Sequence, residues 1–222
     1  MSKHIHFKIF IFALLLLYVP ARGIAGSVSG TIKVKGLRSP ANVLMFITKA
    51  PEVDLDFSKA KFIIDQKDLT FMPHILPVPV GATVFFPNHD KVDHNVFSLS
   101  RTKKFNFGSY KPGENKSIRF DKPGIVELRC DVHAEMLAYI MVMKNPFFGI
   151  TDTKGHFQIP DPHYLKQAGL TGIETIPAGK YTVKTWHEKL KTKKQTIEIP
   201  AEGTVSVKLD LTRGTPSVLY KR

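Results

Sequence analysis

The chain has 222 residues, of which 43% are hydrophobic and 16 are phenylalanine, so it can build one large or two small cores, and disorder is excluded. Its formal net charge of +13 favours an anionic partner, such as an acidic protein, a membrane surface or a nucleic acid, or a basic solvated surface. Cysteine occurs once, which excludes an internal disulfide and leaves a buried inert thiol, an intermolecular link, a nucleophile or a metal ligand.

The first 25 residues have the pattern of a secretory signal peptide. Basic residues precede an apolar run from Ile9 to Val19, and Gly23 and Ala25 stand at the small-residue positions before a cleavage site. The run is shorter than the roughly 20 residues of a membrane-spanning helix. We therefore expect residues 1–25 to be removed, and the mature chain to be periplasmic or secreted, without a transmembrane segment. Export makes nucleic acid the least favoured partner.

Short runs with alternating apolar and polar residues fill the rest of the chain, separated by glycine and proline. In chain order these runs are "SGTIKVKG", "NVLMFIT", "KFIIDQKD", "ILPVPVGATVFFPN", "HNVFSLS", "KSIRF", "GIVELRC", "LAYIMVMK", "GITDTKGHFQIP", "IPAGKYTVKTWHE", "KKQTIEIP" and "TVSVKLDL". Only "DPHYLKQAGLTG" is a candidate for a short helix or an ordered loop. The pattern predicts an all-β protein of two modules, divided near Asn145.

The only thiol, Cys130, ends one of the predicted strands. In "GIVELRC" the alternation places Cys130 on the inward side of the strand. His133 and Met136 fall in the loop before the next strand, so a thiolate, an imidazole and a thioether can converge at one end of a sandwich. His94, which begins the strand "HNVFSLS" after the loop "PNHDKVD", is the best candidate for a second imidazole.

Two imidazoles, one thiolate and a weak axial thioether are the ligand set of a type 1, or blue, copper centre. Thiolate and thioether are soft ligands that hold Cu(I), whereas imidazole suits both oxidation states. The alternative for the thiol is a cysteine nucleophile with His94 or His133 as its base, although the closed loop leaves little room for a substrate. A multicopper oxidase would need paired His-x-His runs, and the one such run, His4 and His6, lies in the predicted signal peptide. We therefore expect no enzymatic activity.

The segments "FPNHDKVDHNVFS" and "KPGIVELRCDVHAEM" resemble the cupredoxins, the plastocyanin and amicyanin group of blue copper proteins. The spacing Cys-x₂-His-x₂-Met, with Pro-Gly shortly before the cysteine, is similar to the amicyanin version. The resemblance extends over roughly Phe71 to Lys144 and implies a Greek-key β-sandwich. It further implies that Asn95 ties the ligand loops together by hydrogen bonds. One copper ion would bind through His94, Cys130, His133 and Met136.

The ligand loop also departs from the family pattern. Asp131 and Glu135 place two carboxylates where many relatives have apolar residues or proline. Glu135 is thereby a competitor of Met136 for the axial position. The resemblance implies that electrons leave through the exposed edge of His133 on an apolar patch, and the two carboxylates argue against a patch of the usual kind.

From about Phe148 onward the chain resembles the carboxypeptidase regulatory-like (transthyretin-like) β-sandwich, through "TDTKGHFQI" and "IPAGKYTVKTWHEKL". The opening strands look like the first half of the same fold. We therefore expect a cupredoxin sandwich and a second small β-sandwich. The expected divisions are a signal peptide (1–25), an N-terminal β segment pairing with the C-terminal module (26–60), a copper domain (61–145) and the regulatory-like sandwich (146–222).

These features predict an exported copper protein that carries single electrons between redox partners such as a cytochrome, a reductase or a dehydrogenase. The alternative function is a copper store or carrier on a cell-surface assembly, without electron transfer. His89 lies five positions before His94, and His187 lies beside the only tryptophan. We expect neither to be a ligand.

Overall fold

The computed structural model describes residues 26–51 and 53–216 of the chain. It consists of strands and one short helix, α1 (Pro162–Ala168), so the predicted all-β fold class is confirmed. The predicted signal peptide lies outside the described residues. Within the described ranges, no helix is both long and apolar enough to cross a membrane.

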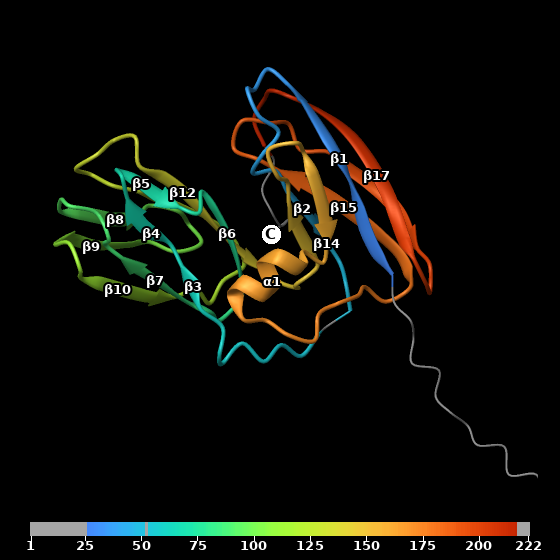
Figure 1. The fold of residues 1–222 in the computed structure, drawn as a ribbon, viewed down its shortest axis with the longest axis horizontal. Coiled ribbons are helices and arrows are strands. Elements are labelled where there is room, and N and C mark those ends of the chain that lie inside the picture. Colours follow the sequence, from blue (N-terminus) through green and yellow to red (C-terminus); the bar gives the residue numbers. More distant parts are fainter. Residues whose placement is uncertain (1–25, 52, 217–222) are drawn as a thin grey trace, which may run out of the picture.

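The strands form two groups, which lie beside each other in Figure 1. The first group contains β3 (Phe62–Ile63), β4 (Asp65–Lys67), β5 (Thr70–Met72), β6 (Ile75–Pro79), β7 (Thr83–Pro87), β8 (His94–Ser98), β9 (Phe105–Tyr110), β10 (Asn115–Arg119), β11 (Gly124–Arg129) and β12 (Leu137–Met143). Five of these strands form a sheet in the order β6-β12-β11-β8-β9, three form a sheet in the order β10-β7-β3, and β4 and β5 form a separate hairpin.

The two larger sheets of this group enclose a common apolar interior. Alternation sends every second side chain inward, so Phe86 from β7 belongs to the same buried cluster as Val96 from β8 and Leu128 from β11. Strands β8 and β11 are antiparallel neighbours, with Arg129 opposite Phe97. The end of β11 therefore lies beside the start of β8, which brings the loops before β8 and after β11 to the same end of the sandwich.

The second group combines the two ends of the described chain. Its strands are β1 (Ser27–Lys35), β2 (Leu44–Ile47), β13 (Phe148–Ile150), β14 (His156–Ile159), β15 (Gly179–Trp186), β16 (Lys194–Ile199) and β17 (Thr204–Thr212). One sheet has the order β14-β1-β17, the other β13-β2-β15-β16. Gly30 permits the close approach of β1 and β17, since a Cβ there would lie 1.8 Å from the Val207 carbonyl oxygen. The domain boundaries after residues 60 and 145 stay a prediction.

Some elements differ from the sequence prediction. The run "KFIIDQKD" was expected as one strand, but β3 pairs with β7 whereas β4 turns away to pair with β5. Strand β9 has no counterpart among the expected runs; it contains Gly108 at φ 67°, and its pairing with β8 is irregular between Asn95 and Phe97. The short helix forms where it was expected, capped by Asp161, whose side chain accepts from the Tyr164 N–H.

The two groups contact each other through polar and aromatic side chains. The His74 Nε2 atom lies 3.2 Å from Glu188 Oε1, and the rings of Tyr139 and Trp186 meet edge to face at 5.1 Å. The hydroxyl of Tyr164 in α1 donates to the carbonyl oxygen of Pro77 in β6. These contacts place the second group against β6 and β12, at the edge of the five-stranded sheet.

Candidate metal centre

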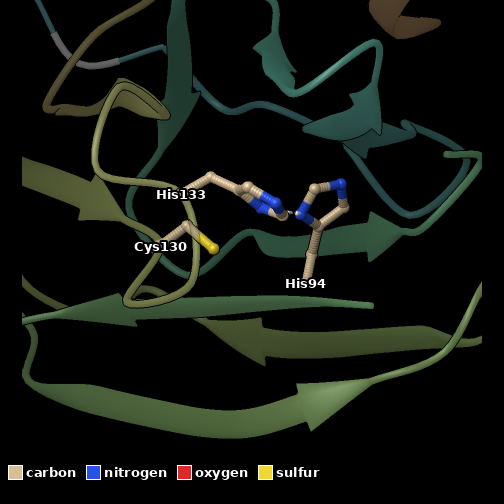
Figure 2. Close-up of side chains that lie close together, drawn as sticks. All are labelled: His94, Cys130 and His133. Atoms are coloured by element: carbon tan, nitrogen blue, oxygen red, sulfur yellow. Dashed lines mark hydrogen bonds between the residues drawn. The ribbon is translucent and has the colours of Figure 1, made fainter. Parts of the chain in front are cut away.

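Three of the predicted ligand residues converge at one end of the first sandwich. His94 begins β8, Cys130 directly follows β11, and His133 lies in the loop before β12. Each offers one donor atom, and these atoms all lie within 4.8 Å of one another. Figure 2 shows the sulfur of Cys130 directed toward the two imidazole rings. Within residues 26–51 and 53–216, this is the group of His, Cys, Asp and Glu side chains that could hold a metal ion.

His94 is buried, with 0% of its surface exposed, and both of its ring nitrogens have neighbours. Its Nε2 atom lies 2.9 Å from Asp90 Oδ2, and its Nδ1 atom lies 3.1 Å from Nδ1 of His133. Because a carboxylate only accepts, Nε2 of His94 carries the hydrogen that bonds Asp90, which leaves Nδ1 as the atom that faces His133. The tautomer required of a ligand is thus set by Asp90.

Asp90 is held as a carboxylate by several hydrogen bonds. The backbone N–H of Leu69 makes the largest contribution, followed by His94 and the N–H of Lys91, and together they lower the pKa of Asp90 to about 2. The distances from Asp90 oxygens to the Leu69 and Lys91 nitrogens are both 2.8 Å. Asp90 therefore stays negatively charged next to His94 through the ordinary pH range.

The donor set fits a copper ion. Two nitrogens that share a metal ion at about 2 Å each cannot be more than roughly 4 Å apart, and the two Nδ1 atoms are 3.1 Å apart. Two imidazole nitrogens and a thiol sulfur are nitrogen and soft sulfur donors, which suit copper. Carboxylates, which hard cations prefer, are outside the group of donor atoms.

Cys130 and Met136 lie on the buried side of the ligand loop. Cys130 is a free thiol with 4% of its surface exposed, and the strand before it buries Leu128 but exposes Arg129, as the alternation predicts. Met136 is 1% exposed and belongs to the same buried cluster as Cys130. The N–H of Met136 donates to the carbonyl of His133 at 3.1 Å, which closes the loop between them. The axial role of Met136 stays a prediction.

Asn95 is buried and bonds to the neighbouring strand. Its Nδ2 donates to Asn106 Oδ1 at 2.7 Å, which joins β8 to β9. Its Oδ1 has no hydrogen-bond partner. The predicted role of Asn95, tying the ligand loops together, therefore rests on an atom that is buried and unpaired, and it stays a prediction.

The sequence prediction missed the roles of Asn88 and Asp90, both in the loop before β8. Asn88 is buried, and its side chain donates to the carbonyls of Val92 and Tyr110 and accepts from the N–H of Asp90. These bonds wrap the loop into the position from which His94 enters the site. The signal was present, since Asn and Asp two residues apart favour a turn closed by the side chain.

The other histidines and acids near the site take no part in the group. The side chain of His89 is 63% exposed, and its Nδ1 lies 3.0 Å from both oxygens of Asp65. Glu135 is exposed, as is Asp131. His187 lies in the second group of strands, where its Nδ1 accepts from the N–H of Lys189.

The surroundings of Cys130 do not favour the alternative of a cysteine nucleophile. Two large clefts, of about 770 and 820 Å³, are lined by residues of other parts of the molecule, and neither includes Cys130, His94 or His133. Of the three residues of the group, His133 is partly exposed and the other two are buried. A nucleophile needs an approach path for its substrate, whereas a metal ligand needs shielding from solvent.

No family model matches the chain, and no curated protein matches it. Among solved structures, it is similar to a purple cupredoxin from Nitrosopumilus maritimus, with 24% identity over 37% of this chain and 100% of the other, at a TM-score of 0.35. A copper-containing nitrite reductase from Thermus scotoductus SA-01 is 26% identical over 38% of this chain and 23% of its own chain, at a TM-score of 0.37. A mutant amicyanin in the Cu(I) state is 19% identical over 43% of this chain and 97% of its own chain, at a TM-score of 0.36.

Cupredoxins are thus among the solved structures that part of this chain resembles. The chain spans less than a quarter of the nitrite reductase. The second resemblance, of the C-terminal part to the regulatory-like sandwich, stays a prediction.

Proposed function

We propose that this chain is a type 1 copper protein that carries single electrons between redox partners. The observation that supports the proposal is the convergence of one buried thiol and two imidazole nitrogens within 4.8 Å. In this proposal His94, Cys130 and His133 form the equatorial plane around one copper ion, and Met136 is the axial ligand. Bound copper would supply a one-electron couple between Cu(I) and Cu(II).

The residues of the site have separate tasks in this proposal. Cys130 binds as the thiolate, whose softness favours copper over harder ions. His94 is held from behind by Asp90, so its ring cannot turn away from the site without losing that bond. His133 is partly exposed, which gives the site an edge at the surface through which an electron can pass.

Speed of electron exchange depends on how little the site rearranges. His94 lies in a strand, Cys130 directly follows the neighbouring strand, and the hydrogen bond between Met136 and His133 closes the loop. Such a framework holds similar geometry in both oxidation states. The surrounding apolar cluster excludes water from the thiolate side.

The proposed partner is a redox protein, such as a cytochrome, a reductase or a dehydrogenase, met outside the cytoplasm. The surface around His133 is mixed: Val132 is 53% exposed, and Asp131 and Glu135 are exposed acids. This combination favours a partner with an apolar contact and basic residues around it. We place the copper domain at residues 61–145, with the strands before and after it forming the second module.

The test is a visible spectrum of the purified chain, without residues 1–25, after addition of one equivalent of Cu(II). We expect an intense blue to purple band from charge transfer between thiolate and copper. C130S should lose the band entirely, and D131N, which changes an exposed neighbour, should keep it. A colourless parent chain would remove the proposal.

A second measurement separates an electron carrier from a copper store. Stopped-flow oxidation and reduction of the copper-loaded chain by small redox mediators should be fast in both directions. Slow exchange in both directions, with the band intact, would favour the store or carrier.

A further inference from the structure

Strands β4 and β5 form a two-stranded sheet of their own, and hydrogen bonds join this hairpin to the loop that precedes His94. Gln66 of β4 forms an isolated bridge with Asn88, and the N–H of His89 donates to the Gln66 carbonyl at 3.0 Å. The ring of His89 pairs with Asp65 of the same strand. The hairpin and the loop therefore form one unit. The last residue of the loop, Asp93, directly precedes His94, a proposed copper ligand.

At the tip of the hairpin, one backbone amide reaches the residue behind that ligand. The N–H of Leu69 donates to Asp90 Oδ2 at 2.8 Å, and the same oxygen lies 2.9 Å from Nε2 of His94. The other oxygen, Asp90 Oδ1, accepts from the Lys91 N–H. The Asp90 side chain is only 11% exposed, so solvent competes little for these bonds.

The conformation of the tip is unusual for its residues. Asp68 and Leu69 have φ of 52° and 55°, in the left-handed region. Glycine and asparagine adopt this region readily, whereas the Cβ of a leucine is strained there. The Leu69 side chain is 39% exposed, so burial of that side chain does not compensate for the strain. What the turn does provide is the hydrogen bond from the Leu69 backbone N–H to Asp90.

We propose that the β4–β5 hairpin positions the imidazole of His94, through hydrogen bonds that run from the Leu69 amide to the Asp90 carboxylate and on to Nε2 of His94. The hydrogen bonds hold the ring with its Nδ1 atom toward His133. The use of that orientation, which is to bind copper, rests on the proposed function. An imidazole in a buried site can rotate by half a turn and exchange its nitrogens. The carboxylate, fixed by Leu69 and Lys91, removes that freedom before any metal binds.

The experiment uses D90A with D93A as its matched control. Asp93 is an exposed carboxylate in the same loop, one residue from His94, so both variants lose a similar charge near the site. In the metal-free parent, nitrogen NMR should show His94 with its hydrogen on Nε2, and hydrogen exchange of the Leu69 amide should be slow. In D90A we expect that tautomer preference to be lost, the Leu69 amide to exchange faster and copper to bind about 10–100-fold more weakly.

D93A should resemble the parent in all three measurements. L69G, which keeps the amide and removes the left-handed strain, should also keep copper affinity and the His94 tautomer. Parent-like tautomer, exchange and affinity in D90A would overturn the inference. Should D90A fail to fold, D90N replaces it, with the His94 tautomer as the deciding measurement. If the parent binds no copper, the copper function fails, and the tautomer and exchange data on metal-free protein still decide whether the hairpin positions His94.

Discussion

The ligand end of the first sandwich and the interior of the second group of strands both bury side chains that bond backbone groups, and the ligand end also directs two ring nitrogens at each other. In the second group, Asn145 donates to the Ile47 carbonyl and accepts from the Phe147 N–H, and Thr151 accepts from the Val43 N–H. At the ligand end, His94 uses one nitrogen to bond Asp90 and directs the other at His133.

The difference teaches how to separate structural from functional polar residues. A side chain that pairs backbone groups stabilises the loop or strand to which it bonds. The two ring nitrogens of His94 and His133 bond each other instead of backbone groups, so a metal ion can replace that hydrogen bond without leaving a backbone group unpaired. The second arrangement is the one expected of metal ligands, so the two kinds of polar residue should respond differently to substitution.

The largest effect is expected on removing either imidazole. H94G and H133G should each lose nearly all of the thiolate-to-copper band. Added imidazole should restore the band in H133G, because that ring is partly exposed and its place can be reached from solvent. It should not do so in H94G, because His94 is 0% exposed. Titration of both variants with imidazole, followed by visible absorption, checks this, and equal rescue would contradict the burial argument.

An intermediate effect is expected in the second group. N145A leaves the Phe147 N–H and the Ile47 carbonyl without their partner in a buried place, which should lower the free energy of unfolding by about 1–3 kcal/mol. Urea unfolding of the metal-free chain measures the loss. The copper spectrum should be unchanged. A shift of the band comparable to that of a ligand variant would break the distinction between the two regions.

The smallest effect concerns the contact between the two groups of strands. Nδ1 of His74 lies 3.1 Å from the Leu137 carbonyl and Nε2 lies 3.2 Å from Glu188, so both nitrogens face acceptors. The hydrogen bond to Glu188 raises the pKa of His74 above its ordinary value of 6.5, even though burial opposes it. The His74 contribution to stability is thus complete below about pH 6.5 and is lost as pH rises through the raised pKa.

The comparison of the parent with H74Q isolates this contribution. Urea unfolding from about pH 6 to about pH 9 should show the parent losing its advantage over H74Q as the pH rises. Glu188 and His187 are present in both chains. Burial lowers the pKa of His187, so that residue destabilises toward acid, the opposite direction from His74. A constant difference between the two chains would show that His74 does not titrate in this range.

Local patterns were enough for the part of the site that lies close in the chain. The inward direction of Cys130 follows from alternation along β11, and the spacing to His133 and Met136 follows from a short loop between adjacent strands. His94 was reached by asking which histidine begins a strand at the same end. The structure brings Cys130, His133 and His94 together.

The parts that were missed depend on contacts between distant segments. Strand β9 was not expected, because the alternation of its residues breaks after Phe107, at Gly108 and Ser109. The bond from Leu69 to Asp90 joins residues 21 positions apart, and no spacing in the chain predicts it.

Side-chain chemistry and period-two alternation are local properties, so the order of residues alone was enough to specify an all-β chain, an inward thiol and the kinds of donor near it. The approach of two ring nitrogens to 3.1 Å, the carboxylate behind one of them and the hairpin behind the carboxylate depend on how strands far apart in the chain pack. That packing is a sum of many weak, non-local contacts, and only the folded structure resolves it.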